Sequence, residues 1–180
     1  MTQADHSDDI PRRADRLYAA RTTMAEAGRS PRRLGIADLV DFLNDPARAL
    51  TMEEQRALFA DPKLRADYRR LKAQAAVVEM PALAAASDGA VNARRFEGGS
   101  VSIHPSRVPG QSYVIVRFTR PACSPRMMLL EGPDGTVAKR ALPEGDTSGE
   151  IMMVLDARSD ADAGFLRLLA DPTSTGTFVL

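Results

Sequence analysis

Reactive side chains are scarce in this chain. Its 180 residues include one cysteine, Cys123, two histidines, His6 and His104, and no tryptophan. A structural zinc site takes four cysteine or histidine ligands and a catalytic site takes three, so these residues predict no zinc site unless carboxylates are added. A single cysteine also excludes an intrachain disulfide. We therefore expect no metal, no cofactor and no disulfide.

Long apolar runs and an excess of one charge are also missing. Stretches free of Asp, Glu, Lys and Arg are at most nine residues long, whereas a membrane-spanning helix needs roughly 20 apolar residues. The N-terminus shows no basic region followed by an apolar core, as a secretory signal would. Lys plus Arg and Asp plus Glu both number 24, so the formal net charge is zero. We expect a cytoplasmic protein without a membrane span, and direct nucleic-acid binding is disfavoured.

Composition and periodicity divide the chain into four segments. Residues 1–33 are polar and rich in arginine, which predicts a flexible or loosely docked arm. Residues 34–80 follow a helical period and predict a three-helix module, whereas 81–97 are rich in Ala, Ser and Gly and predict a linker. Residues 98–180 change to a period of two and predict an antiparallel β-sandwich of immunoglobulin-like architecture. The predicted fold class is therefore α+β.

Local signals mark the starts of the three helices. Apolar residues at i, i+3, i+4 and i+7 over 36–43 form a one-sided stripe. Residues 51–54, Thr-Met-Glu-Glu, are a capping box in which the first and last side chains satisfy two helix N–H groups. Asp61 followed by Pro62 is typical of an N-cap and a first helical residue, and this helix is expected to end before Pro81.

The second half predicts short strands and one further helix. Residues 132–135, Gly-Pro-Asp-Gly, are a strong turn signal, so the segments on either side should form a hairpin. Strands are expected around Val101 and Ile103 and over 113–118, 127–130, 136–142, 151–155 and 176–180, with a helix over 161–170.

Three groups of residues are candidates for chemistry. His104 directly precedes a proline in a predicted strand, which favours a surface histidine over a catalytic base. Cys123 has at most one histidine available to activate it, so an unreactive thiol is favoured over a nucleophile. Asp156, Asp160 and Asp162 lack the spacing of a calcium-binding EF-hand loop, and a solvated loop with a helix-capping aspartate explains them. An enzyme is therefore disfavoured.

The third predicted helix has a basic face. Five of its side chains are cationic and Asp67 is the one acidic residue over 62–74, which gives a net charge of +4. Such a face can hold phosphates, but the chain as a whole is neutral and poor in aromatics. A solvated face opposite the apolar stripe is the favoured interpretation. The five basic residues are Lys63, Arg65, Arg69, Arg70 and Lys72.

The helical segment carries more apolar surface than a small three-helix core easily hides. Helices of about nine residues are marginal alone and are stabilised mainly by packing. Some of these side chains either pack on the third helix or form a surface that a partner protein completes. The candidate partner-binding residues are Leu39, Val40, Phe42, Leu43, Leu58 and Phe59.

The same segment resembles the zinc-finger-type anti-sigma domain over residues 36–75. The likeness lies in the sequences at 39–43 and 50–54 and in the residues from Leu58 to Arg65. In that family a His-x-x-x-Cys-x-x-Cys motif binds zinc, and its ligand positions fall here on Ala57, Asp61 and Leu64, so the metal would be lost. The resemblance implies a bacterial helical clamp that binds a sigma factor and represses transcription initiation.

The leading hypothesis is a non-catalytic regulatory protein that acts by protein–protein contact, with a sigma factor as the partner that the resemblance implies. The alternative is a ligand-binding or auxiliary β-domain of an enzyme system, with the helices as a docking arm. A hydrolase that uses Cys123 or the aspartates is a third, less favoured hypothesis. The sequence does not distinguish a ligand site in the β-domain from a surface that only contacts protein.

Overall fold

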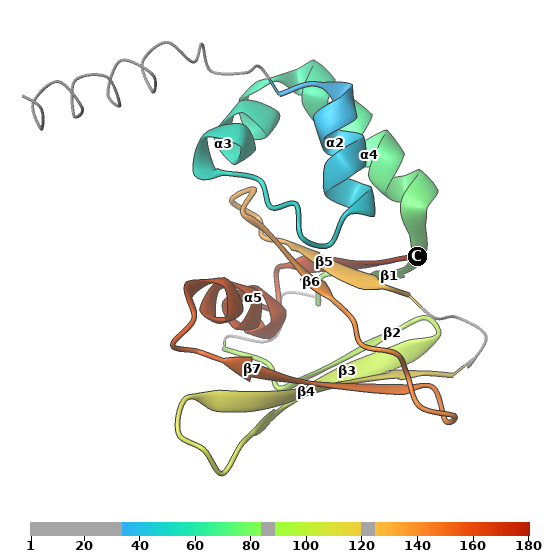
Figure 1. The fold of residues 1–180 in the computed structure, drawn as a ribbon, viewed down its shortest axis with the longest axis vertical. Helices are drawn as coiled ribbons and strands as arrows, with labels where there is room; N and C mark the ends of the chain where they lie inside the picture. The colour runs from blue at the N-terminus through green and yellow to red at the C-terminus, as the bar shows by residue number, and fades with distance from the viewer. Residues whose placement is uncertain (1–33, 84–88, 120–124) are drawn as a thin grey trace, which may run out of the picture. The chain divides into compact units, whose positions relative to one another are not determined.

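The computed structural model describes residues 34–83, 89–119 and 125–180. Leu34–Leu180 form one compact unit in which three helices, a first β-sheet and a second β-sheet follow one another as layers (Figure 1). The α+β class with packed antiparallel sheets is therefore confirmed. The arm expected over 1–33 and the loop that holds Cys123 lie outside the described residues.

The three predicted helices are present, and the second and third begin where their capping signals predict. The three helices are α2 (Ile36–Asn44), α3 (Met52–Ala60) and α4 (Pro62–Ala75). The Glu54 N–H donates to Thr51 Oγ1 at 3.2 Å, and the Thr51 N–H donates to Glu54 Oε2 at 2.8 Å, so the capping box is complete. Asp61 Oδ1 accepts from the Lys63 N–H at 2.8 Å, as expected of an N-cap before Pro62.

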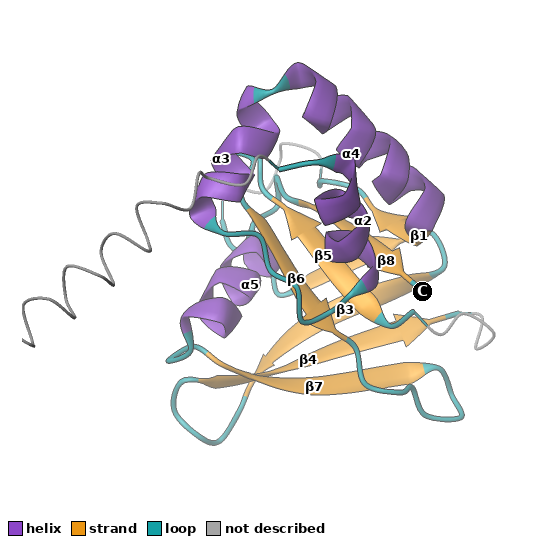
Figure 2. Ribbon diagram, turned by 45° about the horizontal axis from the view of Figure 1, so that its top comes forward, coloured by secondary structure: helices purple, strands orange, loops and turns teal. Residues whose placement is uncertain are grey.

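Each sheet has four antiparallel strands (Figure 2). Sheet A has the order β1 (Ala76–Met80), β8 (Thr175–Val179), β5 (Met127–Glu131), β6 (Val137–Ala141). Sheet B has the order β2 (Ala93–Phe96), β3 (Gly99–Pro105), β4 (Gln111–Phe118), β7 (Glu150–Asp156). The predicted hairpin across residues 132–135 is confirmed, because β5 pairs with β6.

The main core lies between the two sheets. Phe96, Phe118 and Phe178 meet there with ring centroids 5.1 to 6.0 Å apart, two of them from sheet B and one from sheet A. Helix α5 (Asp160–Ala170) buries Phe165 and Leu169 in this core and contacts β5, β6 and β7. The sandwich is therefore closed by α5 on the side where β6 and β7 are the edge strands, and β1 and β2 lie close together on the other side.

Strand β5 is buried on both faces. Met128 and Leu130 point into the core between the sheets, whereas Leu129 joins Val137 in a second core beneath the helices. A strand covered on both sides is expected to be an unbroken apolar run, as residues 127–130 are. Helices α2 to α4 are thus packed directly on the outer face of sheet A.

Two predicted boundaries differ in the structure. The third helix ends at Ala75 instead of continuing to Pro81, because residues 76–80 form β1 and pair with β8. The segment expected to be a linker contains β2, which pairs with β3. Residues 81–97 therefore do not separate two compact units, and the helices and both sheets share one unit.

Candidate functional site

Most of the side chains expected to bind a partner are buried in the chain's own core. Their burial follows from the position of sheet A, whose Leu129 and Val137 complete the core under the helices. The interpretation of these side chains as an exposed partner surface is therefore wrong for four of the six. Those four, each at most 3% exposed, are Leu39, Phe42, Leu43 and Leu58.

The other two candidates, Val40 and Phe59, are half-buried. The Phe59 ring packs against the turn between β5 and β6, where a Cβ added to Gly135 would lie 2.8 Å from Phe59 Cγ. Gly135 has a φ of +84°, a conformation that glycine adopts without strain. Phe59 is therefore a contact between α3 and sheet A and does not belong to a continuous apolar surface.

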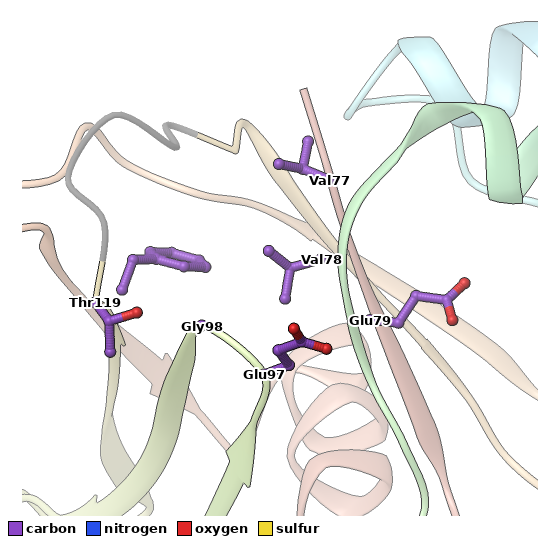
Figure 3. Close-up of a pocket in the computed structure, with 7 residues that line it drawn as sticks. Val77, Val78, Glu79, Glu97, Gly98 and Thr119 are labelled. Atoms are coloured by element: carbon purple, nitrogen blue, oxygen red, sulfur yellow. The ribbon is translucent and has the colours of Figure 1, made fainter.

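A cleft opens instead at the β1–β2 side of the sandwich (Figure 3). It has a volume of about 510 Å³ and is lined by Val77, Val78 and Glu79 of β1, Glu97 and Gly98 of the turn after β2, and Phe118 and Thr119 at the end of β4. Val77 and Val78 lie on one side of β1 and Glu79 lies on the opposite side. The cleft therefore combines apolar walls with carboxylates.

A second cavity of about 460 Å³ continues along the same strand. It shares Glu79 and Glu97 with the first cavity and extends past Met80 and Pro81 to Ala82. We call the two cavities together the β1 groove; they follow the main chain over residues 77–82. Six extended residues span about 20 Å, so the β1 groove has the length of a short peptide in a strand conformation.

The β1 groove carries negative charge. Within residues 34–83, 89–119 and 125–180, neither Glu79 nor Glu97 has an ion-pair partner. Lys72 also lines the second cavity, but its ammonium is already engaged, because its Nζ lies 2.7 Å from Glu131 Oε2. Within the described ranges the groove thus has two carboxylates without an ion-pair partner: Glu97 on the same side of β1 as Val77 and Val78, and Glu79 on the opposite side. A carboxylate close to apolar side chains attracts a cationic group attached to an apolar chain.

A further cavity of about 460 Å³ lies between the helices, β6 and α5. Lys139 lines it, and burial lowers the pKa of this lysine to about 8. Its ammonium, however, donates to the main-chain carbonyl oxygens of Phe42 and Asp45. Lys139 is therefore committed to holding the end of α2 on sheet A and is not a free cation for a ligand.

The side chains that the sequence analysis weighed for catalysis or metal binding do not form a common site in the described ranges. His104 is exposed on β3, where its Nε2 lies 3.0 Å from Ser102 Oγ. Asp162 is buried, accepts from the Asp156 N–H at 3.0 Å and pairs with Arg140, so it connects the end of β7 to α5 and β6. In the described part of the chain, no three His, Cys, Asp or Glu side chains are grouped to hold a metal.

Two of the positions that correspond to zinc ligands in the anti-sigma family have structural roles in the helices. Asp61 is the N-cap of α4, and Leu64 packs against the core beneath the helices. Of the basic residues of α4, Lys63, Arg69 and Arg70 are exposed, as a solvated face predicts, whereas Lys72 faces sheet A and pairs with Glu131.

Sequence reasoning missed the β1 groove. Glu79 was expected in a helix and Glu97 in a linker, so no pattern connected them. They come together because β1 and β2 are neighbouring edge strands of the two sheets. The sequence predicted neither of these two strands. The turn glycines Gly98 and Gly99 were the one local signal near this site.

Every helix in the described ranges is too short or too polar to cross a membrane. Comparison of the chain with models of known families, with curated proteins and with solved structures finds no match. The resemblance of residues 36–75 to an anti-sigma domain therefore stays a prediction.

Proposed function

We propose that this chain is a non-catalytic regulatory protein that acts by protein–protein contact, and that the β1 groove binds an extended basic segment of its partner. The observation that carries the proposal is the pair of carboxylates, Glu79 and Glu97, that have no ion-pair partner in the described ranges and line a groove along edge strand β1 and the two residues after it. Extended segments bind along exposed sheet edges by main-chain contacts, and side-chain pockets give them specificity.

The groove supports a peptide better than a compact ligand because its lining is elongated and includes six consecutive residues, 77–82, of β1 and the segment after it. Apolar contacts with Val77, Val78 and Phe118 would hold alternate side chains, and the carboxylates would select arginine or lysine at the positions between them. A sigma factor is the first partner to test, since the resemblance of the helices suggests it. The contact proposed for it is the β1 groove, because the helical residues are buried.

Fluorescence anisotropy with the full chain tests the proposal. The probes are a labelled octapeptide of alternating valine and arginine and the same peptide with glutamate in place of arginine. Two exposed ion pairs together contribute about 1.4 kcal/mol to the binding free energy. The basic peptide should therefore bind roughly tenfold more tightly than the glutamate peptide. A Glu79→Gln/Glu97→Gln variant should lose this preference.

The matched control is Glu53→Gln/Glu144→Gln, which removes the same charge from two exposed positions away from the groove. It should keep the preference for the basic peptide. Equal binding of both peptides to the unmodified chain, or an equal effect of the two double variants, would count against the β1 groove as the site.

The alternative function, a ligand-binding β-domain, is favoured by the first cavity taken alone. Its volume of about 510 Å³ and its Phe118 and Glu97 suit a small amine with an apolar chain. Agmatine is a suitable probe: a rise in melting temperature that Glu97→Gln removes would favour this function. Peptide binding without any agmatine effect would favour the protein contact.

A further inference from the structure

The outer face of sheet B carries an exposed apolar patch that no described element covers. Met152 and Val154 of β7 are 58% and 52% exposed, and in the antiparallel register they lie beside Ile115 and Tyr113 of β4. The patch adjoins the free edge of the sheet, because β7 is the last strand of sheet B (Figure 2). Open apolar edges are sites at which another strand can pair.

The hydrogen bonds define which main-chain groups of β7 point away from β4. The Phe118 N–H donates to the Gly149 carbonyl and the Ala157 N–H donates to the Gly110 carbonyl. In an antiparallel ladder these two bonds make residues 150, 152, 154 and 156 the non-hydrogen-bonded positions toward β4. Their N–H and C=O groups therefore face the open edge.

Both ends of this edge are already occupied. Asp146 binds the Glu150 main chain on both sides, since its Oδ1 accepts from the Glu150 N–H at 2.9 Å and its own N–H donates to the Glu150 carbonyl at 2.9 Å. At the other end the Asp156 N–H donates to Asp162 Oδ2. Between these caps, Met152 and Val154 each present one unpaired donor and one unpaired acceptor within the described ranges.

We propose that a second copy of this chain pairs with β7 antiparallel, about a two-fold axis at Met153. In this register Met152 lies opposite Val154 of the second copy, and both pairs exchange two main-chain hydrogen bonds. Every free edge group of the two chains is then satisfied, and none of the capped groups is needed. This self-complementarity argues for a second copy over an unrelated strand.

The side chains agree with the same register. Pairing places Tyr113 and Val154 of one copy in line with Met152 and Ile115 of the second copy, and the symmetry repeats this row. The two exposed patches become one apolar surface across an eight-stranded sheet. Cross-strand pairs of apolar side chains stabilise a sheet in this way.

The contact between the two copies is short, and acidic side chains at its two ends repel one another. Glu150, whose Oε2 lies 2.6 Å from Arg117 Nε, would face Asp156 of the second copy. Like charges opposite one another weaken pairing, and salt screens them. The dimer therefore forms at high concentration and strengthens when salt is added. It leaves the β1 groove free, because β2 and β7 are opposite edges of sheet B.

Light scattering and sedimentation of the full chain from micromolar to millimolar concentration test the proposal. The expected mass rises from 19.5 kDa toward twice that value, and more steeply at higher salt. Met152→Lys should keep the chain monomeric, whereas His104→Lys, on the same face but away from the edge, should leave the rise unchanged. Circular dichroism melting confirms that both variants are folded.

Cysteine cross-linking in a Cys123→Ser background tests the register. Opposed residues in a non-hydrogen-bonded pair have Cα atoms about 4.5 Å apart, within disulfide range. Met153→Cys should therefore give a disulfide-linked dimer, whereas Met152→Cys and Val154→Cys should give little. A monomeric mass over the whole range, or cross-linking only at 152 or 154, would overturn the proposal. Binding of a labelled polyvaline peptide to the β7 edge of a chain that stays monomeric would also overturn the proposal, since that result assigns the edge to a different protein.

Discussion

Lys139 of β6 holds the end of α2 through Phe42. Its Nζ lies 4.2 Å from the centroid of the Phe42 ring and donates to the Phe42 carbonyl oxygen, and it also donates to the Asp45 carbonyl at 2.6 Å. These carbonyls belong to the last turn of α2 and to its C-cap, where helical partners are lacking. One lysine thus connects the helical layer to sheet A.

Replacement of this lysine should loosen the helical layer. Lys139→Met keeps the apolar stem but removes the donor, so we expect the free energy of unfolding to fall by about 2 kcal/mol. Urea denaturation followed by circular dichroism measures the change. Lys63→Met, at an exposed position of α4, is the control and should change the free energy by less than about 0.5 kcal/mol. Equal effects of the two variants would contradict the role of Lys139.

The same lysine should make stability depend on pH. Burial lowers its pKa to about 8 from an ordinary value of 10.5, so above pH 8 the unfolded chain binds more protons at this site than the folded chain. The free energy of unfolding of the wild-type chain should therefore rise between about pH 8 and 10.5 relative to that of Lys139→Met. Urea titrations of both chains at a series of pH values measure this difference, which should be constant below pH 7. A constant difference up to pH 10.5 would contradict the lowered pKa.

Local signals predicted the helix starts but not where the third helix ends. The capping box at Thr51 and Glu54 and the Asp61 cap act within a few residues, so they could be read directly. Residues 76–80 continue the apolar pattern of α4, and they become a strand only because β8, about 100 residues later, offers a partner. Pairing over that distance leaves no local mark.

The site was hidden for a related reason. The apolar stripe that contains Leu43 correctly predicts a buried helix face, but a stripe does not say what covers it. The partner is Leu129, on a strand whose other face is also buried. The partner-surface hypothesis therefore failed because nothing within the helical segment points to this strand, although its unbroken apolar run over 127–130 is typical of a strand buried on both faces. Glu79 and Glu97 share no motif and meet only in the folded chain.

Leu43→Asp distinguishes a core residue from a surface residue. Leu43 is 3% exposed, so a carboxylate there would be buried without a partner, and we expect the free energy of unfolding to fall by about 4 kcal/mol or more. Ile36→Asp, on the same helix at 47% exposure, should cost less than about 1 kcal/mol. Thermal melting of both variants gives the comparison. A Leu43→Asp chain that melts like the wild type would restore the interpretation of Leu43 as a surface residue.

Two glycines should respond to alanine in opposite directions. A Cβ at Gly135 would lie 2.8 Å from Phe59 Cγ at a φ of +84°, so Gly135→Ala should lower the free energy of unfolding by about 1–3 kcal/mol. A Cβ at Gly164 in α5 would meet nothing within 4 Å, so Gly164→Ala should raise it by about 0.5–1 kcal/mol through helix propensity. Urea midpoints of the two variants test both signs. A stable Gly135→Ala chain would show that α3 does not rest on the β5–β6 turn.

Arg94 should resist replacement even by lysine. It is 2% exposed, and its Nη2 donates to the carbonyl oxygens of Pro81 at 2.8 Å and Ser174 at 2.6 Å, while its Nη1 donates to Ser174 Oγ at 2.9 Å. The guanidinium thereby joins β2 of sheet B to the residues after β1 and before β8 in sheet A. An ammonium cannot reproduce this fork, and a buried polar group left unpaired is costly.

Arg94→Lys should therefore lower the free energy of unfolding by about 2–4 kcal/mol. The exposed neighbour Arg95 provides the matched control, and Arg95→Lys should change it by less than about 0.5 kcal/mol. Because β2 also carries the turn that holds Glu97, amide hydrogen exchange should show faster exchange at residues 93–99 in Arg94→Lys. Unchanged amide exchange in β2 together with a loss of stability of the whole chain would show that Arg94 contributes to packing but does not hold this strand. In that case other contacts would determine the shape of the β1 groove.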